Sequence, residues 1–203
     1  FKLSKMKQPD LENFVGIHNR KYCDGGQCIR LYKTFMKKKD PEAANIVMGH
    51  NEEDLLGLGT IFSLLAYKKL YDGEYHPKQC VILEQELKIV IELSAAAPVN
   101  VSCGNSDFYL SVNGYEARML VHLKEGKLRQ YYRNYKDYEF IPGEDTAMPK
   151  SITRYMDKSL KIATTPQTCY TWFNCDEDFL NNEKKQMQYL THTLPFFLDN
   201  LNK

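Results

Sequence analysis

Apolar positions up to about residue 72 recur at the spacing of three and four residues that is typical of amphipathic helices. Asp24 is in position to cap one of these helices, and Asp40-Pro41 joins an N-cap to a proline at the first position of the next. We expect this last helix to break or bend near Gly49, where Asn51 can act as a new N-cap. The first part of the chain is therefore predicted to be helical.

The pattern changes to short β-rich runs beyond about residue 75. Glu84-Gln85-Glu86 is a predicted turn between two such runs, and Asn113-Gly114 is a strong hairpin signal between two more. Further along we expect a strand over residues 127–135, a helix over 151–160 and a final helix over 183–201. The strands predict an antiparallel meander, either a curved sheet or a small barrel.

These patterns together predict an α+β chain with two modules. Residues 1–74 form the helical module, and residues 75–203 form a β-rich accessory module with a C-terminal helix. The hydrophobic content of 43% and the charged content of 26% are ordinary for a globular protein. The formal net charge of +1 neither requires nor excludes a nucleic-acid partner. No apolar run approaches the ~20 residues of a membrane helix, so we expect no membrane partner.

Cysteine usage and the start of the chain suggest where the protein works. No two cysteines form a CxxC motif, and no signal peptide precedes them, so we expect free thiols in a reducing cytoplasm. The chain begins at Phe1 rather than at Met and runs directly into structured-looking sequence at residues 2–5, from which we expect a fragment of a longer protein. The six cysteines are Cys23, Cys28, Cys80, Cys103, Cys169 and Cys175.

His50 and Asp54 form the sharpest candidate site. In a helix, residues four apart share a face, and this face turns toward the apolar residues of the same helix. A carboxylate there needs a partner, and a metal ion is one. The alternative is a helix start in which Asn51 is the cap and residues 52–54 place acidic groups in the first turn. The spacing by itself leaves both interpretations open.

The order of motifs around this site is more specific. A short helix ends in Gly-Ile, a glycine follows, then Leu-Tyr with a basic stretch, then Asp-Pro, and finally an aromatic residue or His, Asn, two variable positions and Asp-Leu. With this pattern, residues 11–70 resemble the C-terminal half of the YprB-type ribonuclease-H-like exonuclease domain, in the DnaQ-like DEDD superfamily. The motifs here are Gly16-Ile17, Gly26, Leu31-Tyr32, Asp40-Pro41 and His50-Asn51-Glu52-Glu53-Asp54-Leu55.

The resemblance implies a 3′-5′ exonuclease that hydrolyses phosphodiester bonds in DNA or RNA with two Mg²⁺ or Mn²⁺ ions. It makes Asp54 the last carboxylate ligand of the metal, and it gives His50 the role of orienting or deprotonating the attacking water. Relatives commonly carry Tyr where this chain has His50. On this basis the nucleic acid is the substrate and the metal ions are the cofactors.

The other carboxylates of that active site are missing from the pattern. The family carries Asp-x-Glu on an apolar strand and a second Asp on a later helix. Asp10-Leu11-Glu12 has the first spacing but follows Lys7-Gln8-Pro9 and predicts a helix start instead. We therefore expect the parent protein to be the exonuclease and this chain to be an incomplete, inactive part of it.

A second candidate surface lies in the β-rich half. Strand alternation over residues 128–135 would place Arg129, Tyr131, Arg133 and Tyr135 on one face. Interleaved cations and aromatic rings are suited to stacking with single-stranded nucleic acid. The alternative is an ordinary exposed sheet face with Tyr and Arg pairs across strands.

Three further alternatives stay open. Glu144, Asp145, Lys150 and Asp157 form either a site or a salt-bridged network of turns. The protein is either the nuclease described above or a non-catalytic nucleic-acid-binding or scaffolding protein with a degenerate nuclease fold. Helix faces left uncovered in a truncated domain make a second copy of the chain a candidate partner.

Overall fold

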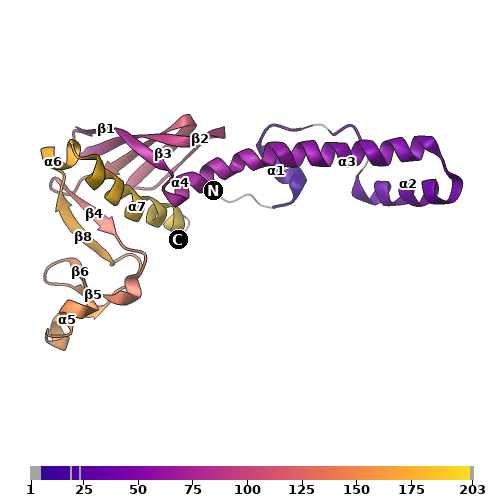
Figure 1. The fold of residues 1–203 in the computed structure, drawn as a ribbon. Coiled ribbons are helices and arrows are strands. Elements are labelled where there is room, and N and C mark those ends of the chain that lie inside the picture. Colours follow the sequence, from indigo (N-terminus) through magenta and orange to yellow (C-terminus); the bar gives the residue numbers. More distant parts are fainter. Residues whose placement is uncertain (1–5, 19, 23, 202–203) are drawn as a thin grey trace. The chain divides into compact units, whose positions relative to one another are not determined.

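The computed structural model describes residues 6–18, 20–22 and 24–201. Helices come first along the chain, antiparallel sheets follow, and a helix closes it, so the predicted α+β class is confirmed (Figure 1). The chain divides into two compact units, one up to Leu65 together with Ala97–Val99 and the other formed by the remainder. The division into modules at residues 1–74 and 75–203 stays a prediction, because compactness alone does not define an independent domain.

Unit 1 is built from helices with clear local start signals. They are α1 (Gln8–Phe14), α2 (Gly25–Lys38), α3 (Pro41–Ile61) and the single 3-10 turn η1 (Phe62–Leu64). The Asp24 side chain accepts a hydrogen bond from the Gln27 amide, and the Asp40 side chain accepts one from the Glu42 amide. Both predicted caps are confirmed.

The expected break at Gly49 is wrong, because α3 runs without interruption past it and Asn51 lies inside the helix. Gly49 serves close packing instead. A Cβ atom there would lie 2.2 Å from the ring of Tyr22, so only glycine admits this ring against the helix. No proline interrupts the hydrogen bonding of α3 after its first turn, and the helix therefore continues.

Unit 1 leaves large apolar side chains in solvent. Helix α2 packs beside α3 but buries none of its described residues. Its Ile29, Tyr32 and Met36 are each at least half exposed, and Leu55 and Leu56 on α3 are more exposed still. These are the uncovered helix faces expected from the sequence. A second copy of the chain as their partner stays a prediction.

Unit 2 begins at Ala66, within α4 (Leu65–Asp72), and continues into a three-stranded sheet in the order β1-β2-β3. The turn between β1 (Tyr75–Leu83) and β2 (Glu86–Gly104) lies where it was predicted. The prediction of a hairpin turn at Asn113-Gly114 is wrong, because β3 (Phe108–His122) continues through these residues. Gly114 adopts a φ of +54° within the strand.

The chain turns between β2 and β3 at Asn105. Its side-chain oxygen accepts hydrogen bonds from the amides of Asp107 (2.8 Å) and Phe108 (3.2 Å). This local bonding replaces the strand ladder over a few residues and reverses the chain.

The later strands form two small sheets rather than a continuation of the meander. β4 (Lys127–Tyr131) pairs with β8 (Tyr170–Asn174), and β5 (Tyr138–Ile141) lies between β6 (Thr146–Pro149) and β7 (Ile162–Ala163). The strand expected over 127–135 therefore ends at Tyr131. The helix expected over 151–160 is also wrong, because that segment contains only two short turns. The short helices are η2 (Tyr135–Asp137), α5 (Lys150–Thr153), η3 (Lys158–Leu160) and α6 (Glu177–Leu180).

The core of unit 2 gathers around the predicted final helix, α7 (Glu183–Asn200), which has Pro195 in its interior. The Phe197 ring stacks on Phe108 of β3 with centroids 4.2 Å apart, and the Phe196 ring stacks on Tyr131 of β4 at 3.8 Å. One helix thus joins two separate sheets. Burial of these rings supplies the main apolar stabilisation of the unit.

The cysteines of unit 2 are buried or half-buried thiols. Cys80, Cys103, Cys169 and Cys175 are free, and burial raises the pKa of both Cys169 and Cys175 to about 11. Such thiols are poor nucleophiles at neutral pH. Cys23 and residues 1–5 lie outside the described part of the chain. No described helix is long and apolar enough to cross a membrane.

We predict that Leu194→Ala destabilises unit 2 by about 2–5 kcal/mol, because the replaced side chain of α7 is fully buried. Trp172 is the single tryptophan of the chain and lies in β8, so its fluorescence during urea unfolding reports on this unit. Leu160→Ala is the control, since Leu160 is 57% exposed. A loss for Leu194→Ala no larger than that for Leu160→Ala would contradict the assigned core.

Candidate functional site

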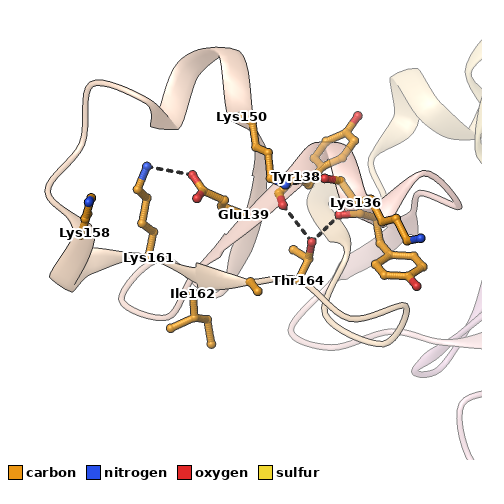
Figure 2. Close-up of a pocket in the computed structure, with 10 residues that line it drawn as sticks. Lys136, Tyr138, Glu139, Lys150, Lys158, Lys161, Ile162 and Thr164 are labelled. Carbon is orange, nitrogen blue, oxygen red and sulfur yellow. Dashed lines mark hydrogen bonds and ion pairs between the residues drawn. The ribbon is translucent and has the colours of Figure 1, made fainter.

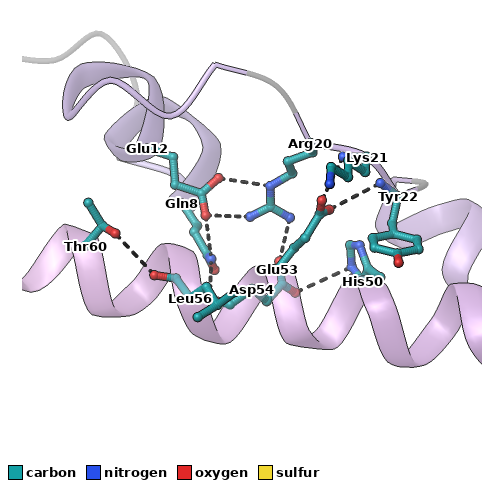
Figure 3. A network of polar contacts seen from close by, with 10 residues as sticks. All are labelled: Gln8, Glu12, Arg20, Lys21, Tyr22, His50, Glu53, Asp54, Leu56 and Thr60. Atoms are coloured by element: carbon teal, nitrogen blue, oxygen red, sulfur yellow. Dashed lines mark hydrogen bonds and ion pairs between the residues drawn. The ribbon is translucent and has the colours of Figure 1, made fainter.

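His50 and Asp54 lie on one face of α3 (Figure 3). The His50 Nε2 atom is 3.4 Å from Asp54 Oδ2. His50 is buried at 9% exposure, whereas the Asp54 side chain is 34% exposed. The Nδ1 atom of His50 is buried and has no hydrogen-bond partner among the described residues. The shared face predicted from their spacing is therefore present.

Arg20 binds two carboxylates from different helices. Its Nη1 atom donates to Asp54 Oδ1 at 2.5 Å. Its Nε and Nη2 atoms donate to the two oxygens of Glu12 at 2.9 Å and 2.7 Å. This bidentate fork is the strongest geometry for an ion pair between arginine and a carboxylate. The guanidinium thus links α1 to α3.

Glu12 is buried at 2% exposure, and two neighbours make this possible. Gln8 donates to Glu12 Oε1 at 2.9 Å and to the backbone oxygen of Asp54 at 3.0 Å. Gly57 of α3 supplies the space, because a Cβ atom there would lie 2.0 Å from Glu12 Oε1. Arg20, Gln8 and Gly57 together define the position of the buried carboxylate.

Glu53 holds the chain segment that carries Arg20. Its carboxylate accepts hydrogen bonds from the backbone amides of Lys21 at 2.7 Å and Tyr22 at 3.2 Å. The segment is therefore anchored to α3 twice, by Asp54 through the Arg20 side chain and by Glu53 through the two backbone amides that follow (Figure 3).

The hydrogen bonds from Arg20 lower the pKa of Glu12, with a further contribution from Gln8 and opposition from burial. The same contacts raise the pKa of Arg20. Glu12 and Arg20 therefore stay oppositely charged at neutral pH. A lowered carboxylate pKa stabilises the folded state above the unfolded pKa of about 4.3, and this stabilisation is lost as pH falls through the folded value.

The carboxylates present do not make a divalent-metal centre by themselves. Mg²⁺ and Mn²⁺ prefer several carboxylate oxygens. Both oxygens of Glu12 and one of Asp54 already accept hydrogen bonds from Arg20, so a positive charge is in place. Within the described ranges, no three His, Cys, Asp or Glu side chains form a group that could hold a metal ion. The roles of Asp54 as metal ligand and His50 as its catalytic neighbour stay predictions.

Glu12 and Arg20 were not identified from the sequence as parts of this site. Glu12 does lie at a helix start, as predicted, but its carboxylate is directed to the same guanidinium as Asp54. One available signal was Gly57, since a glycine inside a helix lowers helix stability by about 1 kcal/mol and indicates a close approach.

The second candidate surface is divided by the structure. Arg129 lies over Tyr170 and Trp172, with its guanidinium carbon 4.6 Å from each ring centroid. Tyr131 is buried at 6% exposure beneath Phe196. Because β4 ends at Tyr131, the predicted alternation does not reach positions 133 and 135.

Arg133 and Tyr135 therefore have separate surroundings. Arg133 is exposed, donates to the Tyr71 hydroxyl at 2.7 Å and lies 3.5 Å from Asp199. Tyr135 begins the η2 turn and is half-buried. The prediction that these four side chains share one face of a strand is wrong. Their role in binding nucleic acid stays a prediction.

Asp145, Asp157 and Lys150, which were candidates for one shared site, each contact different partners. Asp145 accepts hydrogen bonds from the Tyr170 hydroxyl at 2.6 Å and from Trp172 Nε1. Asp157 caps η3 by accepting from Ser159, while Lys150 donates to the backbone oxygen of Lys136. These residues form local networks rather than one shared site.

We predict that Arg20→Met destabilises unit 1 by about 1–3 kcal/mol at neutral pH, because it leaves Glu12 buried and unpaired. Wild-type unit 1 should lose protection as the pH falls below the unfolded carboxyl pKa of about 4.3 and through the lowered pKa of Glu12. The variant should instead gain protection as pH falls, since protonation relieves the unpaired charge. Hydrogen exchange of α1, corrected for the intrinsic effect of pH, measures both.

Lys21→Met is the matched control for this experiment. It removes a neighbouring cation, but the contact of Lys21 with Glu53 uses the backbone amide and is retained. Equal protection of α1 in the two variants at neutral pH would contradict a structural role for the arginine fork.

Comparison with known families identifies the N-terminal segment. Residues 2–66 match the family model described as RNase_H superfamily. No curated protein and no solved structure matches the chain. The match covers about a third of the sequence and confirms the ribonuclease-H-like resemblance, while the YprB type stays a prediction. Glu12, Arg20, His50 and Asp54 therefore all lie within the segment that is similar to the RNase H superfamily.

Proposed function

We propose that this chain acts on nucleic acid as part of an RNase H-like nuclease, namely a metal-dependent exonuclease that hydrolyses phosphodiester bonds in DNA or RNA. The observation that carries the proposal is the place of Asp54. This partly exposed carboxylate lies beside His50 within the matched segment. The proposal covers the protein to which the chain contributes rather than a complete active site in the chain.

The chemistry available to the described residues is limited and specific. Asp54 presents Oδ2 toward His50 Nε2, so the carboxylate can orient the imidazole. A role for this imidazole as acceptor of a proton from the attacking water would use Nε2, on the side of Asp54, because Nδ1 is buried. Bound Mg²⁺ or Mn²⁺ would supply charge stabilisation for the leaving oxygen, but the carboxylates needed for it must come in addition to Asp54.

A non-catalytic nucleic-acid-binding or scaffolding protein is the second candidate function. The observation that favours it is the guanidinium of Arg20, which already forms ion pairs with both Asp54 and Glu12. A site stabilised in this way retains the nuclease fold without needing a metal ion. The two candidates differ in whether Asp54 can exchange Arg20 for a divalent cation.

Nucleic-acid contact through unit 2 belongs to both candidates. Arg129 keeps its proposed role, now together with Trp172, because the stacked cation and ring are the type of group against which a base can pack. Tyr131 is a core residue in this arrangement and offers no free face. Exposed Arg133 remains a proposed phosphate contact.

We predict that Arg20→Gln raises the affinity of the chain for Mn²⁺ by about tenfold, which corresponds to about 1.4 kcal/mol, because it frees the oxygens of Asp54 and Glu12. Mn²⁺ titration followed by electron paramagnetic resonance measures the free ion directly. Adding Asp54→Asn to this variant should abolish the gain. A gain that persists in the double variant would show that Asp54 is not a ligand.

We predict that the chain binds labelled single-stranded oligonucleotides and that any hydrolysis supported by Mn²⁺ falls at least about 100-fold in Asp54→Asn. Glu52→Gln is the control, since it removes an exposed acid from the same helix. Release of labelled nucleotides that is unchanged in Asp54→Asn would place the active site elsewhere. Failure to bind DNA or RNA at low salt would contradict the nuclease and would leave only the scaffolding form of the second candidate.

A further inference from the structure

A lysine-rich pocket lies among the small elements of unit 2 (Figure 2). Its volume is about 580 Å³, within the range of small-molecule sites. Four lysines line it, from η2, from the start of α5, from η3 and from the residue before β7, and Glu139 of β5 is the one acidic residue among the lining side chains. We call this feature the lysine pocket. Its lysines are Lys136, Lys150, Lys158 and Lys161.

The charges in the lysine pocket do not balance. The Lys161 Nζ atom lies 2.9 Å from Glu139 Oε2, and the Thr153 hydroxyl also donates to this carboxylate. These contacts lower the pKa of Glu139, which therefore stays ionised and neutralises one lysine. Three ammonium groups remain in excess on the lining.

The excess lysines retain hydrogen-bonding capacity. Lys150 Nζ donates to the backbone oxygen of Lys136 at 2.6 Å, and an ammonium group has three donors, so two are left. Lys136 and Lys158 are exposed and have no ion pair within the described ranges. The acids adjacent to them in sequence are engaged elsewhere, Asp137 with Asn134 and Asp157 with Ser159.

Hydrogen bonds fix the walls of the lysine pocket. The Thr164 hydroxyl lies within hydrogen-bonding distance of the backbone oxygens of Tyr135 and Tyr138, which holds the end of β7 against η2 (Figure 2). The Tyr138 ring stacks on Tyr132 with centroids 5.1 Å apart. A site whose walls are already ordered loses less entropy when a ligand binds.

We propose that the lysine pocket binds a phosphate-bearing ligand. Several ammonium groups around one cavity repel each other, and an anion with more than one charge relieves this repulsion. Phosphate oxygens accept several hydrogen bonds at once, and lysine is a common phosphate-binding residue. The adjoining rings of Tyr135 and Tyr138 provide apolar surface for the organic part of the ligand.

This inference goes beyond the proposed nuclease relationship, because the whole lysine pocket lies outside the matched residues 2–66. Two sources carry the same chemistry: the backbone of a single-stranded nucleic acid and a small phosphorylated molecule. The test therefore uses two probes with the full chain. One is inorganic pyrophosphate in a calorimetric titration, and the other is a labelled ten-nucleotide single strand followed by fluorescence anisotropy.

The test variant is Lys136→Ala with Lys158→Ala, and its matched control is Lys33→Ala with Lys184→Ala. Both remove two exposed positive charges, but only the first pair comes from the lysine pocket. We expect the affinity for the bound probe to fall at least tenfold in the test variant and less than twofold in the control. For the oligonucleotide, the slope of log K against log salt should decrease by about 1.4, at about 0.7 per lost contact.

The two probes also separate the sources of phosphate. Pyrophosphate binding that is lost in the test variant assigns the lysine pocket to small phosphorylated molecules, and a loss confined to the oligonucleotide assigns it to a nucleic-acid backbone. The inference is overturned if neither probe binds the wild-type chain at millimolar concentration, or if the test variant binds both probes as tightly as the control variant does. Oligonucleotide binding that is unchanged in the test variant, together with no pyrophosphate binding, would reject the lysine pocket but leave the nucleic-acid function standing.

Discussion

The buried carboxylate of Glu12 is the constraint on which unit 1 depends. Such a group costs several kcal/mol unless a cation and hydrogen bonds accompany it. Arg20 supplies the cation and the hydrogen bonds, and it also binds Asp54. One side chain from the segment that precedes α2 therefore connects α1 to α3. Up to Leu65, no large apolar side chain in the described part of the chain is buried. Polar contacts therefore take the place that an apolar core occupies in unit 2.

Arg20 and a divalent metal ion would compete for the same carboxylate oxygens in this arrangement. The oxygens of Glu12 and Asp54 that stabilise the fold through Arg20 are the same type of atom that a divalent ion would use. A cation can be present there as a guanidinium or as a metal, and each form excludes the other from the shared oxygens. The helices of the segment can thus stay together through Arg20 without a metal ion. The affinity of the chain for Mn²⁺ depends on how strongly Glu12 and Asp54 prefer the guanidinium.

In unit 2, the aromatic rings that pack the core and the lysines that line the pocket are different sets of residues. The apolar face of α7 packs against two sheets through Phe196 and Phe197, and these stacked pairs include none of the lysines around the third sheet. Lys136 and Lys158, which are exposed, are therefore available for a ligand. The half-buried pair of Arg129 and Trp172 lies on the same unit, so both surfaces proposed to contact phosphate or bases belong to unit 2.

The sequence by itself determined the features that depend on neighbours a few residues apart. The caps at Asp24 and Asp40 and the shared face of His50 and Asp54 follow from local hydrogen bonding and the helical period. Tertiary structure alone decided that Arg20 joins Glu12 to Asp54, that β4 ends at Tyr131 and that lysines from residues 136–161 surround one cavity. These features depend on which distant segments pack together, and local preference is too weak to specify that choice.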